Sequence, residues 1–168
     1  AMMLAVRRLV EEKPDYKPLL AERIAAISNC MGRNPQLAAE SYPDECWTFD
    51  HVVALSATRI ADHLDGTDHS ALRRAWVAMA KTRLLDPQSG LLVSDYHLDG
   101  KPKDGPEGST IWMTAYCLRL IDEAFAQDQY AKAKTALARR ACGFGYSREW
   151  PEGWQGPVDV DSGAVIPV

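Results

Sequence analysis

A sequence pattern that recurs after 60 residues constrains the fold of this chain most strongly. Ile60-Ala61-Asp62-His63 corresponds to Leu120-Ile121-Asp122-Glu123, and Asp68 corresponds to Asp128. In each unit an apolar stretch with helical spacing is followed by a short connection and a more amphipathic, basic stretch. Because the apolar helix has no broad polar face, we expect it to lie inside the fold, with the basic helix outside it. The pattern predicts stacked helical hairpins that close into an α/α toroid.

Three such hairpins fit the chain, with a proline, a glycine or a capping acid between their helices. Pro14 ends the first helix, and Gly66 ends the third, which Pro43-Asp44 begins. A short strand is expected instead at Leu91–Leu98, where Asp99-Gly100 indicates a β-hairpin near residues 91–101. The predicted class is therefore all-α with one short β-hairpin. The expected helices cover residues 2–12, 15–31, 44–64, 70–85, 110–126 and 128–142.

Composition is that of an ordinary globular domain and excludes several classes of protein. The chain has 168 residues, of which 46% are hydrophobic and 25% charged, and a net charge of −4, which suits one domain over residues 1–168. No basic stripe favours binding to nucleic acid or anionic lipid, and no apolar stretch approaches the ~20 residues of a membrane span. The first residues are charged too early for a signal peptide, so the localisation stays unknown. Four cysteines without C-x-x-C spacing predict neither a metal nor another cofactor.

The C-terminal sequence, Val165-Ile166-Pro167-Val168, stops within an apolar run. Because domains rarely end on unshielded apolar residues, we expect the chain to be the N-terminal half of a longer barrel. We expect the chain to bind a small-molecule substrate. We also expect it either to self-associate or to pack against further C-terminal residues.

Four short motifs lie within residues 41–168. They are Tyr42-Pro-x-x-x-Trp47, Leu85-Asp-Pro-x-x-Gly-Leu91, Gly108-Ser-x-x-Trp112 and Asp159-Val-Asp-Ser-Gly163. A chain of helical hairpins that carries these motifs resembles the linalool dehydratase/isomerase-like family. It also resembles, more loosely, the six-hairpin glycosidase-like proteins. The resemblance implies an (α/α)6 barrel with a central pocket at the N-terminal ends of its inner helices. It also implies metal-independent acid/base chemistry on small apolar alcohols.

The first candidate site combines an acid and an imidazole near the start of the 44–64 helix. Trp47, Asp50 and His51 fall at positions i, i+3 and i+4 and so share one helix face. An acid beside a histidine could transfer protons, because the histidine pKa lies near the operating pH. In the alternative interpretation, Asp50 interacts with the helix dipole and His51 is hydrogen-bonded in the core.

Two further groups of residues could face the same pocket. Strand alternation puts Asp95 and Tyr96 on opposite sides of the expected hairpin. One of these sides could face the mouth of the pocket. In the alternative interpretation, the polar residues here only belong to a solvent-exposed turn. Trp112 opens a second inner helix much as Trp47 opens the first. Such a pair of aromatic residues could hold a sugar or an apolar ligand, and core packing is the alternative.

The last group is the pair Asp159 and Asp161, which point the same way in an extended segment. They could act as acid and base, or they could cap a turn or bind a cation. The sequence therefore predicts a lyase/isomerase-like enzyme, with a glycoside hydrolase or a non-catalytic glycan- or ligand-binding module as the alternative. The expected catalytic residues are Asp50, His51, Asp95, Asp159 and Asp161. The expected substrate-binding residues are Tyr42, Trp47, Tyr96, Ser109, Trp112 and Tyr116.

Overall fold

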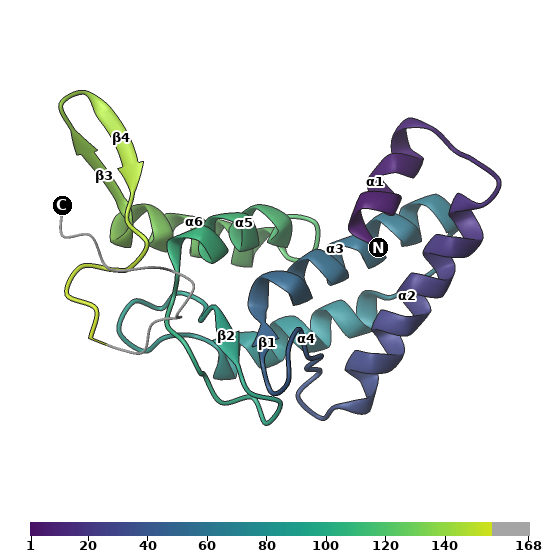
Figure 1. Ribbon diagram of the computed structural model, residues 1–168, viewed down its shortest axis with the longest axis horizontal. Coiled ribbons are helices and arrows are strands. Elements are labelled where there is room, and N and C mark those ends of the chain that lie inside the picture. Colours follow the sequence, from purple (N-terminus) through teal and green to yellow (C-terminus); the bar gives the residue numbers. More distant parts are fainter. Residues whose placement is uncertain (156–168) are drawn as a thin grey trace.

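The computed structural model describes residues 1–155 as a mainly helical fold with two small antiparallel sheets (Figure 1). The mainly helical class expected from the hydrophobic spacing is therefore confirmed. None of the helices in this part of the chain is long and apolar enough to cross a membrane. The helices are α1 (Met2–Val10), α2 (Tyr16–Arg33), α3 (Thr48–Asp65), α4 (Ser70–Arg83), α5 (Gly108–Leu118) and α6 (Glu123–Ala136). The strands are β1 (Cys46–Trp47), β2 (Asp95–Tyr96), β3 (Ala138–Ala141) and β4 (Phe144–Ser147).

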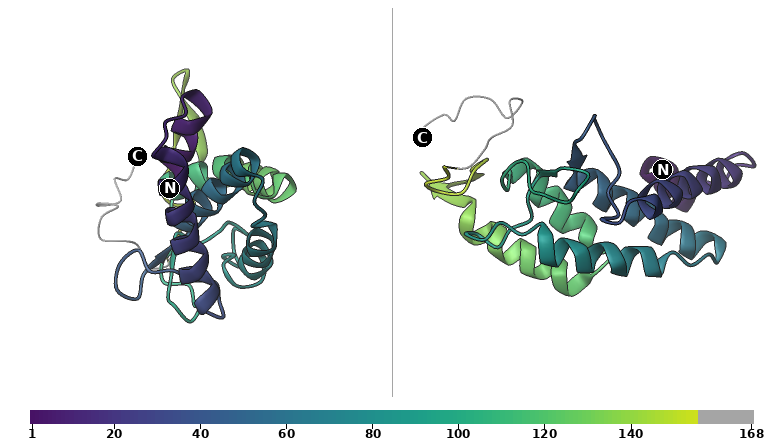
Figure 2. Two further views of the ribbon diagram at one scale, coloured as in Figure 1. Left: turned by 90° about the vertical axis from the view of Figure 1, so that its right-hand side faces the viewer. Right: turned by 90° about the horizontal axis from the view of Figure 1, so that it is seen from below.

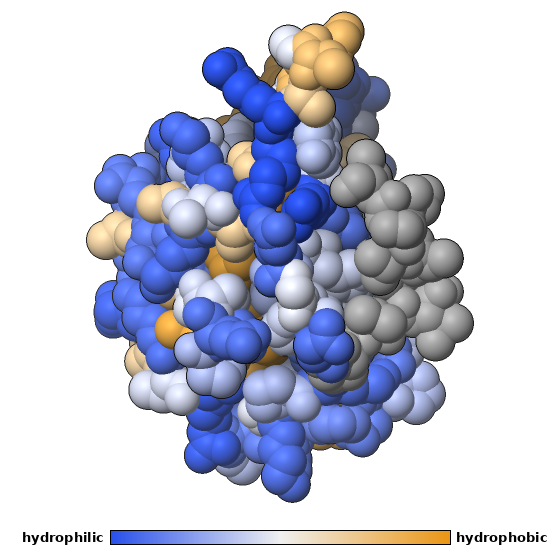
Figure 3. All heavy atoms as spheres, turned by 90° about the vertical axis from the view of Figure 1, so that its left-hand side faces the viewer, coloured by the Kyte–Doolittle hydropathy of each residue, from blue (hydrophilic) through white to orange (hydrophobic). Residues whose placement is uncertain are grey.

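Helix α3 is the central element of the molecule. It contacts α1 on one side and α5 on the other, while α2 packs against α1 and α3, and α6 packs along α5. The N-terminal pair of helices therefore lies at one end, and α6 with the β3–β4 hairpin lies at the other (Figure 2). At that second end the surface is mostly hydrophilic, with hydrophobic atoms gathered at the projecting top (Figure 3).

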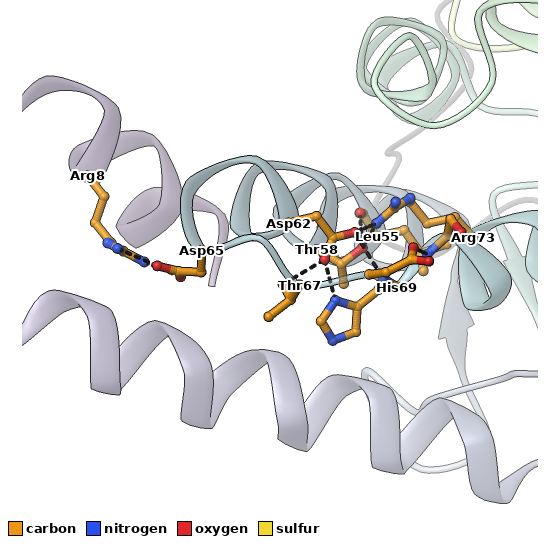
Figure 4. A network of polar contacts seen from close by, with 10 residues as sticks. Arg8, Leu55, Thr58, Asp62, Asp65, Thr67, His69 and Arg73 are labelled. Carbon is orange, nitrogen blue, oxygen red and sulfur yellow. Dashed lines mark hydrogen bonds and ion pairs between the residues drawn. The ribbon is translucent and has the colours of Figure 1, made fainter.

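Two apolar clusters hold the helices together, and α3 contributes to both. The larger cluster joins Val52 and Leu55 of α3 to Trp76 of α4 and to side chains of α5 and α6. The smaller cluster packs the second half of α3 against α1 and α2. An ion pair between Arg8 of α1 and Asp65 of α3, with an N–O distance of 2.7 Å, adds a polar contact to this second junction (Figure 4).

Helix α3 begins four residues later than the sequence predicts. Asp44 has a φ of 56°, which places it in a turn rather than in a helix. The following residues form β1, which pairs antiparallel with β2, so that Cys46 lies opposite Tyr96 and Trp47 opposite Asp95. At its other end the helix stops as expected, because Gly66 adopts a left-handed φ of 70° and its N–H bonds to the carbonyl of Asp62.

The hairpin predicted near residues 91–101 is largely replaced by other contacts. Strand β2 covers only two residues and its ladder partner is β1, although a turn does bring Tyr96 opposite Pro102 in an isolated bridge. Leu91 and Leu92 are both fully buried in the larger cluster. The alternating strand expected over 91–98 is therefore wrong, because both leucines point into the core.

The fifth and sixth helices also differ from their predicted bounds. Helix α5 ends at Leu118 and α6 begins at Glu123, capped by the carboxylate of Asp122, which accepts a hydrogen bond from the backbone of Phe125. Asp128, where the sixth helix is expected to begin, lies inside α6. The predicted end near Cys142 is wrong as well, because Cys142 and Gly143 both have positive φ and form the turn of the β3–β4 hairpin.

Candidate functional site

A cavity of about 370 Å³ lies where the N-terminal ends of α3 and α5 meet. Most of its wall is aromatic or apolar, and one carboxylate and three hydroxyl groups supply most of the polarity. The sequence predicts a role in the site for four of the lining residues. The lining consists of Tyr42, Trp47, Phe49, Asp50, Ser109, Thr110 and Met113.

The start of α3 is fixed by hydrogen bonds to the segment that precedes β2. The backbone N–H of Thr48 donates to the carbonyl of Ser94 at 2.9 Å, and its hydroxyl donates to the carbonyl of Val93 at 2.6 Å. These bonds satisfy groups at the helix terminus that have no partner inside the helix. Trp47, the last residue before the helix, is thereby placed at the wall of the cavity.

Asp50 supplies the carboxylate of the cavity from the first turn of α3. The hydroxyl of Ser41 donates a 2.6 Å hydrogen bond to its Oδ2. Its Oδ1 has no hydrogen-bond partner within residues 1–155. A carboxylate near a helix N-terminus is stabilised by the helix dipole. Asp50 is therefore oriented by one hydroxyl and has an acceptor oxygen left for a ligand.

Ser109 reaches the cavity from the first turn of α5, where Glu149 caps the helix. The Ser109 hydroxyl donates to Oε1 of Glu149 at 2.5 Å, and its backbone N–H points to the same carboxylate. Gly108 allows this approach, because a Cβ atom there would lie 2.4 Å from the carbonyl oxygen of Arg148. Sequence reasoning missed Glu149, which follows β4 and carries no local signal of its role.

His51 does not line the cavity, although it is adjacent to Asp50 in the chain. Its side chain is buried, with Nε2 accepting from the backbone N–H of Ala39 at 2.9 Å. Nδ1 must therefore carry the proton, which it donates to the carbonyl of Trp47 at 2.8 Å. Burial lowers the pKa of His51. The geometry supports the alternative interpretation of a hydrogen-bonded core histidine rather than proton transfer.

Asp95 and Tyr96 are also fully buried and lie outside the cavity. Oδ1 of Asp95 accepts from the backbone N–H of Cys46 at 2.9 Å, and Oδ2 lies 3.3 Å from the Lys103 ammonium. Burial raises the pKa of Asp95, and Lys103 opposes that effect only in part. Burial likewise raises the pKa of Tyr96. Asp95 therefore joins β1 to β2 and has no access to a ligand.

Trp112 and Tyr116 line a different cavity, also of about 370 Å³, between α5 and α6. The Trp112 indole donates to the hydroxyl of Ser147 at 2.7 Å and packs edge-on against Tyr130. The two tryptophans expected to flank one pocket thus belong to two cavities. Asp159 and Asp161 lie outside the described residues.

Among the described residues, no histidine or cysteine lines either of these two cavities. Within residues 1–155, no three His, Cys, Asp or Glu side chains are grouped so that they could hold a metal ion. The cysteines are free thiols, and burial raises the pKa of Cys46 to about 12. Such a thiol stays protonated near neutral pH and is a poor nucleophile. No known protein-family model matches the chain.

Proposed function

We propose that the chain binds a small, largely apolar alcohol in the cavity between the starts of α3 and α5. We further propose that it acts there as a lyase/isomerase-like enzyme, with Asp50 transferring the proton. The observation that carries the proposal is that Trp47, Asp50 and Ser109, from separate segments, line one cavity.

The lining matches this class of ligand. Tyr42, Trp47, Phe49 and Met113 provide a wall for a hydrocarbon, and a volume of about 370 Å³ falls within the ordinary range for small-molecule sites. A ligand hydroxyl can donate to Oδ1 of Asp50, which has no hydrogen-bond partner among the described residues. The pocket therefore favours a ligand with one polar group and a larger apolar body.

Asp50 is the carboxylate among the lining residues. Removal of water from an alcohol requires a proton to leave a carbon and a proton to reach the departing hydroxyl. In the proposed step, Oδ1 of Asp50, left over by the hydrogen bond from Ser41 to Oδ2, takes the proton from the carbon next to the one that carries the hydroxyl. The C–O bond breaks as the C=C bond forms, and the same proton passes from Asp50 to the departing hydroxyl, which leaves as water. No step in this scheme needs a metal.

We also propose that the three hairpins form part of an α/α toroid, as the resemblance to the linalool dehydratase/isomerase-like family implies. Two observations support this arrangement. Helices α1, α3 and α5 contact one another in that order, as successive inner helices would. The cavity lies at the N-terminal ends of α3 and α5, where the resemblance places the pocket.

The experiment is to incubate the protein with linalool and follow loss of water by gas chromatography. We expect Asp50→Asn to lower the rate by at least about 100-fold, because proton transfer by a side chain contributes roughly 10²–10⁴-fold. The matched control is Asp15→Asn, an exposed acid on the opposite part of the molecule. Asp50-dependent hydrolysis of nitrophenyl glycosides instead would replace this proposal with the glycosidase alternative. Activity that is unchanged in Asp50→Asn would contradict both.

A further inference from the structure

A third cavity, lined largely by charged residues, lies at the other end of α3. Its volume is about 470 Å³, and its wall comes from the second half of α3, the first turns of α4 and the connection between α5 and α6. None of its residues takes part in the candidate site described above. Its most prominent members are three arginines, namely Arg59, Arg73 and Arg74.

Arg73 is held rigidly in this wall by a network of polar contacts (Figure 4). Its buried Nη1 donates to the hydroxyl of Thr58 at 2.8 Å and to the carboxylate of Asp62 at 2.7 Å. Asp62 also accepts from the Thr67 hydroxyl and from both the backbone and the ring of His69. The Asp62 carboxylate is therefore fully occupied, and it fixes the Arg73 guanidinium in place.

The guanidinium groups keep unused hydrogen-bond donors. In residues 1–155, Nε and Nη2 of Arg73 have no acceptor, and neither Arg59 nor Arg74 forms an ion pair. Asp68, an exposed acid in the same wall, bonds to the backbone N–H of Ser70 at 2.8 Å. Three arginines against Asp62 and Asp68 leave the lining with an excess positive charge.

Two apolar residues also belong to the lining of the cavity. Leu120 is 41% exposed, and Ile121 lies beside it in the connection between α5 and α6. A ligand that fills the cavity would therefore meet both cationic donors and hydrocarbon. A simple inorganic anion has no hydrocarbon part that could contact Leu120 and Ile121.

We propose that this cavity binds a small phosphate monoester, with the phosphate on Arg59, Arg73 and Arg74 and the organic part against Leu120 and Ile121. Guanidinium groups bind phosphate oxygens with paired, charge-assisted hydrogen bonds. Arg73 is already fixed by Asp62 and Thr58, so binding does not have to order its side chain.

The test is calorimetric titration of the whole chain with phenyl phosphate, inorganic phosphate and phenol. We expect saturable binding of phenyl phosphate, weaker binding of inorganic phosphate and none of phenol at this site. Arg59→Gln and Arg74→Gln should each weaken the binding of phenyl phosphate by about tenfold, the size of a lost charge-assisted hydrogen bond. Asp68→Asn should strengthen it, because it removes a competing negative charge.

The matched control is Arg23→Gln, which removes an exposed arginine of α2 and should leave the affinity unchanged. Circular dichroism of each variant verifies that the fold is retained. Binding that is equally strong in the double variant R59Q/R74Q would overturn the proposal. Absence of saturable binding would overturn it too, as would capture of phosphatidic acid vesicles without binding of the soluble ester. The proposed activity at Asp50 uses other residues and would survive any of these results.

Discussion

The backbone N–H of Ala39 donates a hydrogen bond of 2.9 Å to Nε2 of His51. Together with the bond from Nδ1 to the carbonyl of Trp47, it ties the loop before β1 to the first turns of α3. The ring stacks on Trp76 at a centroid distance of 6.2 Å and contacts Tyr96 at 5.4 Å. His51 therefore supports the wall of the cavity that contains Trp47 and Asp50 without entering it.

Replacement of this histidine should destabilise the fold. His51→Ala leaves the Ala39 N–H and the Trp47 carbonyl without their partner and opens a space beside Trp76. We expect a loss of about 3 kcal/mol in the free energy of unfolding, measured by urea denaturation. His63→Ala, at an exposed position of the same helix, should change it by less than about 0.5 kcal/mol. Equal effects of the two substitutions would contradict the structural role of His51.

The buried histidine also predicts a dependence of stability on pH. Burial lowers the pKa of His51 below its ordinary value of 6.5, so the unfolded chain binds a proton more readily than the folded one. Stability should therefore fall as the pH drops below about 6.5. The measurement compares urea unfolding at pH 7.5 and 5.5 in the wild type and in His51→Gln. An identical pH dependence in both proteins would show that His51 is not responsible.

Asp62 should also destabilise the fold as the pH falls, but in a lower pH range than His51. Burial alone would raise its pKa, but the hydrogen bonds from His69, Thr67 and Arg73 outweigh that effect and lower the pKa to about 2. Its contribution is fully present above the unfolded value near 4 and disappears as the pH falls from about 4 to 2. Asp62→Asn should cost about 3–5 kcal/mol at pH 7, because the buried Arg73 loses its counter-charge. Thermal unfolding measures this cost, and a shift no larger than that of Asp68→Asn would contradict it.

A glycine substitution tests how α5 is positioned. Gly108→Ala places a Cβ atom 2.4 Å from the carbonyl oxygen of Arg148, so the segment that carries Glu149 has to move. We expect a loss of about 1–3 kcal/mol in chemical denaturation. Gly145 has open space around it and an ordinary φ, so Gly145→Ala should have a much smaller effect. The reverse order of the two effects would contradict the close packing at Gly108.

The helices could be predicted from the sequence because their apolar spacing is local, but several of their ends could not. The start of α3 depends on Cys46, whose N–H bonds to Asp95, 49 residues further on. Asp122 and Asp128 are equally plausible caps by residue type. The choice between them depends on the burial of Phe125 and Ala126, which the local sequence does not reveal.

The candidate site is also predictable only in part, because local spacing places some of its residues and contacts between distant segments place the others. The sequence predicts Trp47, Asp50 and Ser109 together, because each stands near the start of an apolar helix, and the three residues line one cavity. Helical spacing alone also predicts His51 in the same site. Spacing cannot show which part of a helix surface is sealed by other elements, and Trp76 and Tyr96 cover His51. Glu149 was missed because a distant hairpin returns it to α5.

The most direct test of the proposed function is a titration of the isotope-labelled protein with linalool, followed by the chemical shifts of its backbone amides. We predict saturable shifts at residues 42, 47, 49, 50, 109, 110 and 113, which line the cavity, and their loss in Trp47→Ala. Absence of saturable shifts at these positions, or shifts confined to the separate cavity of Trp112 and Tyr130, would contradict the proposal.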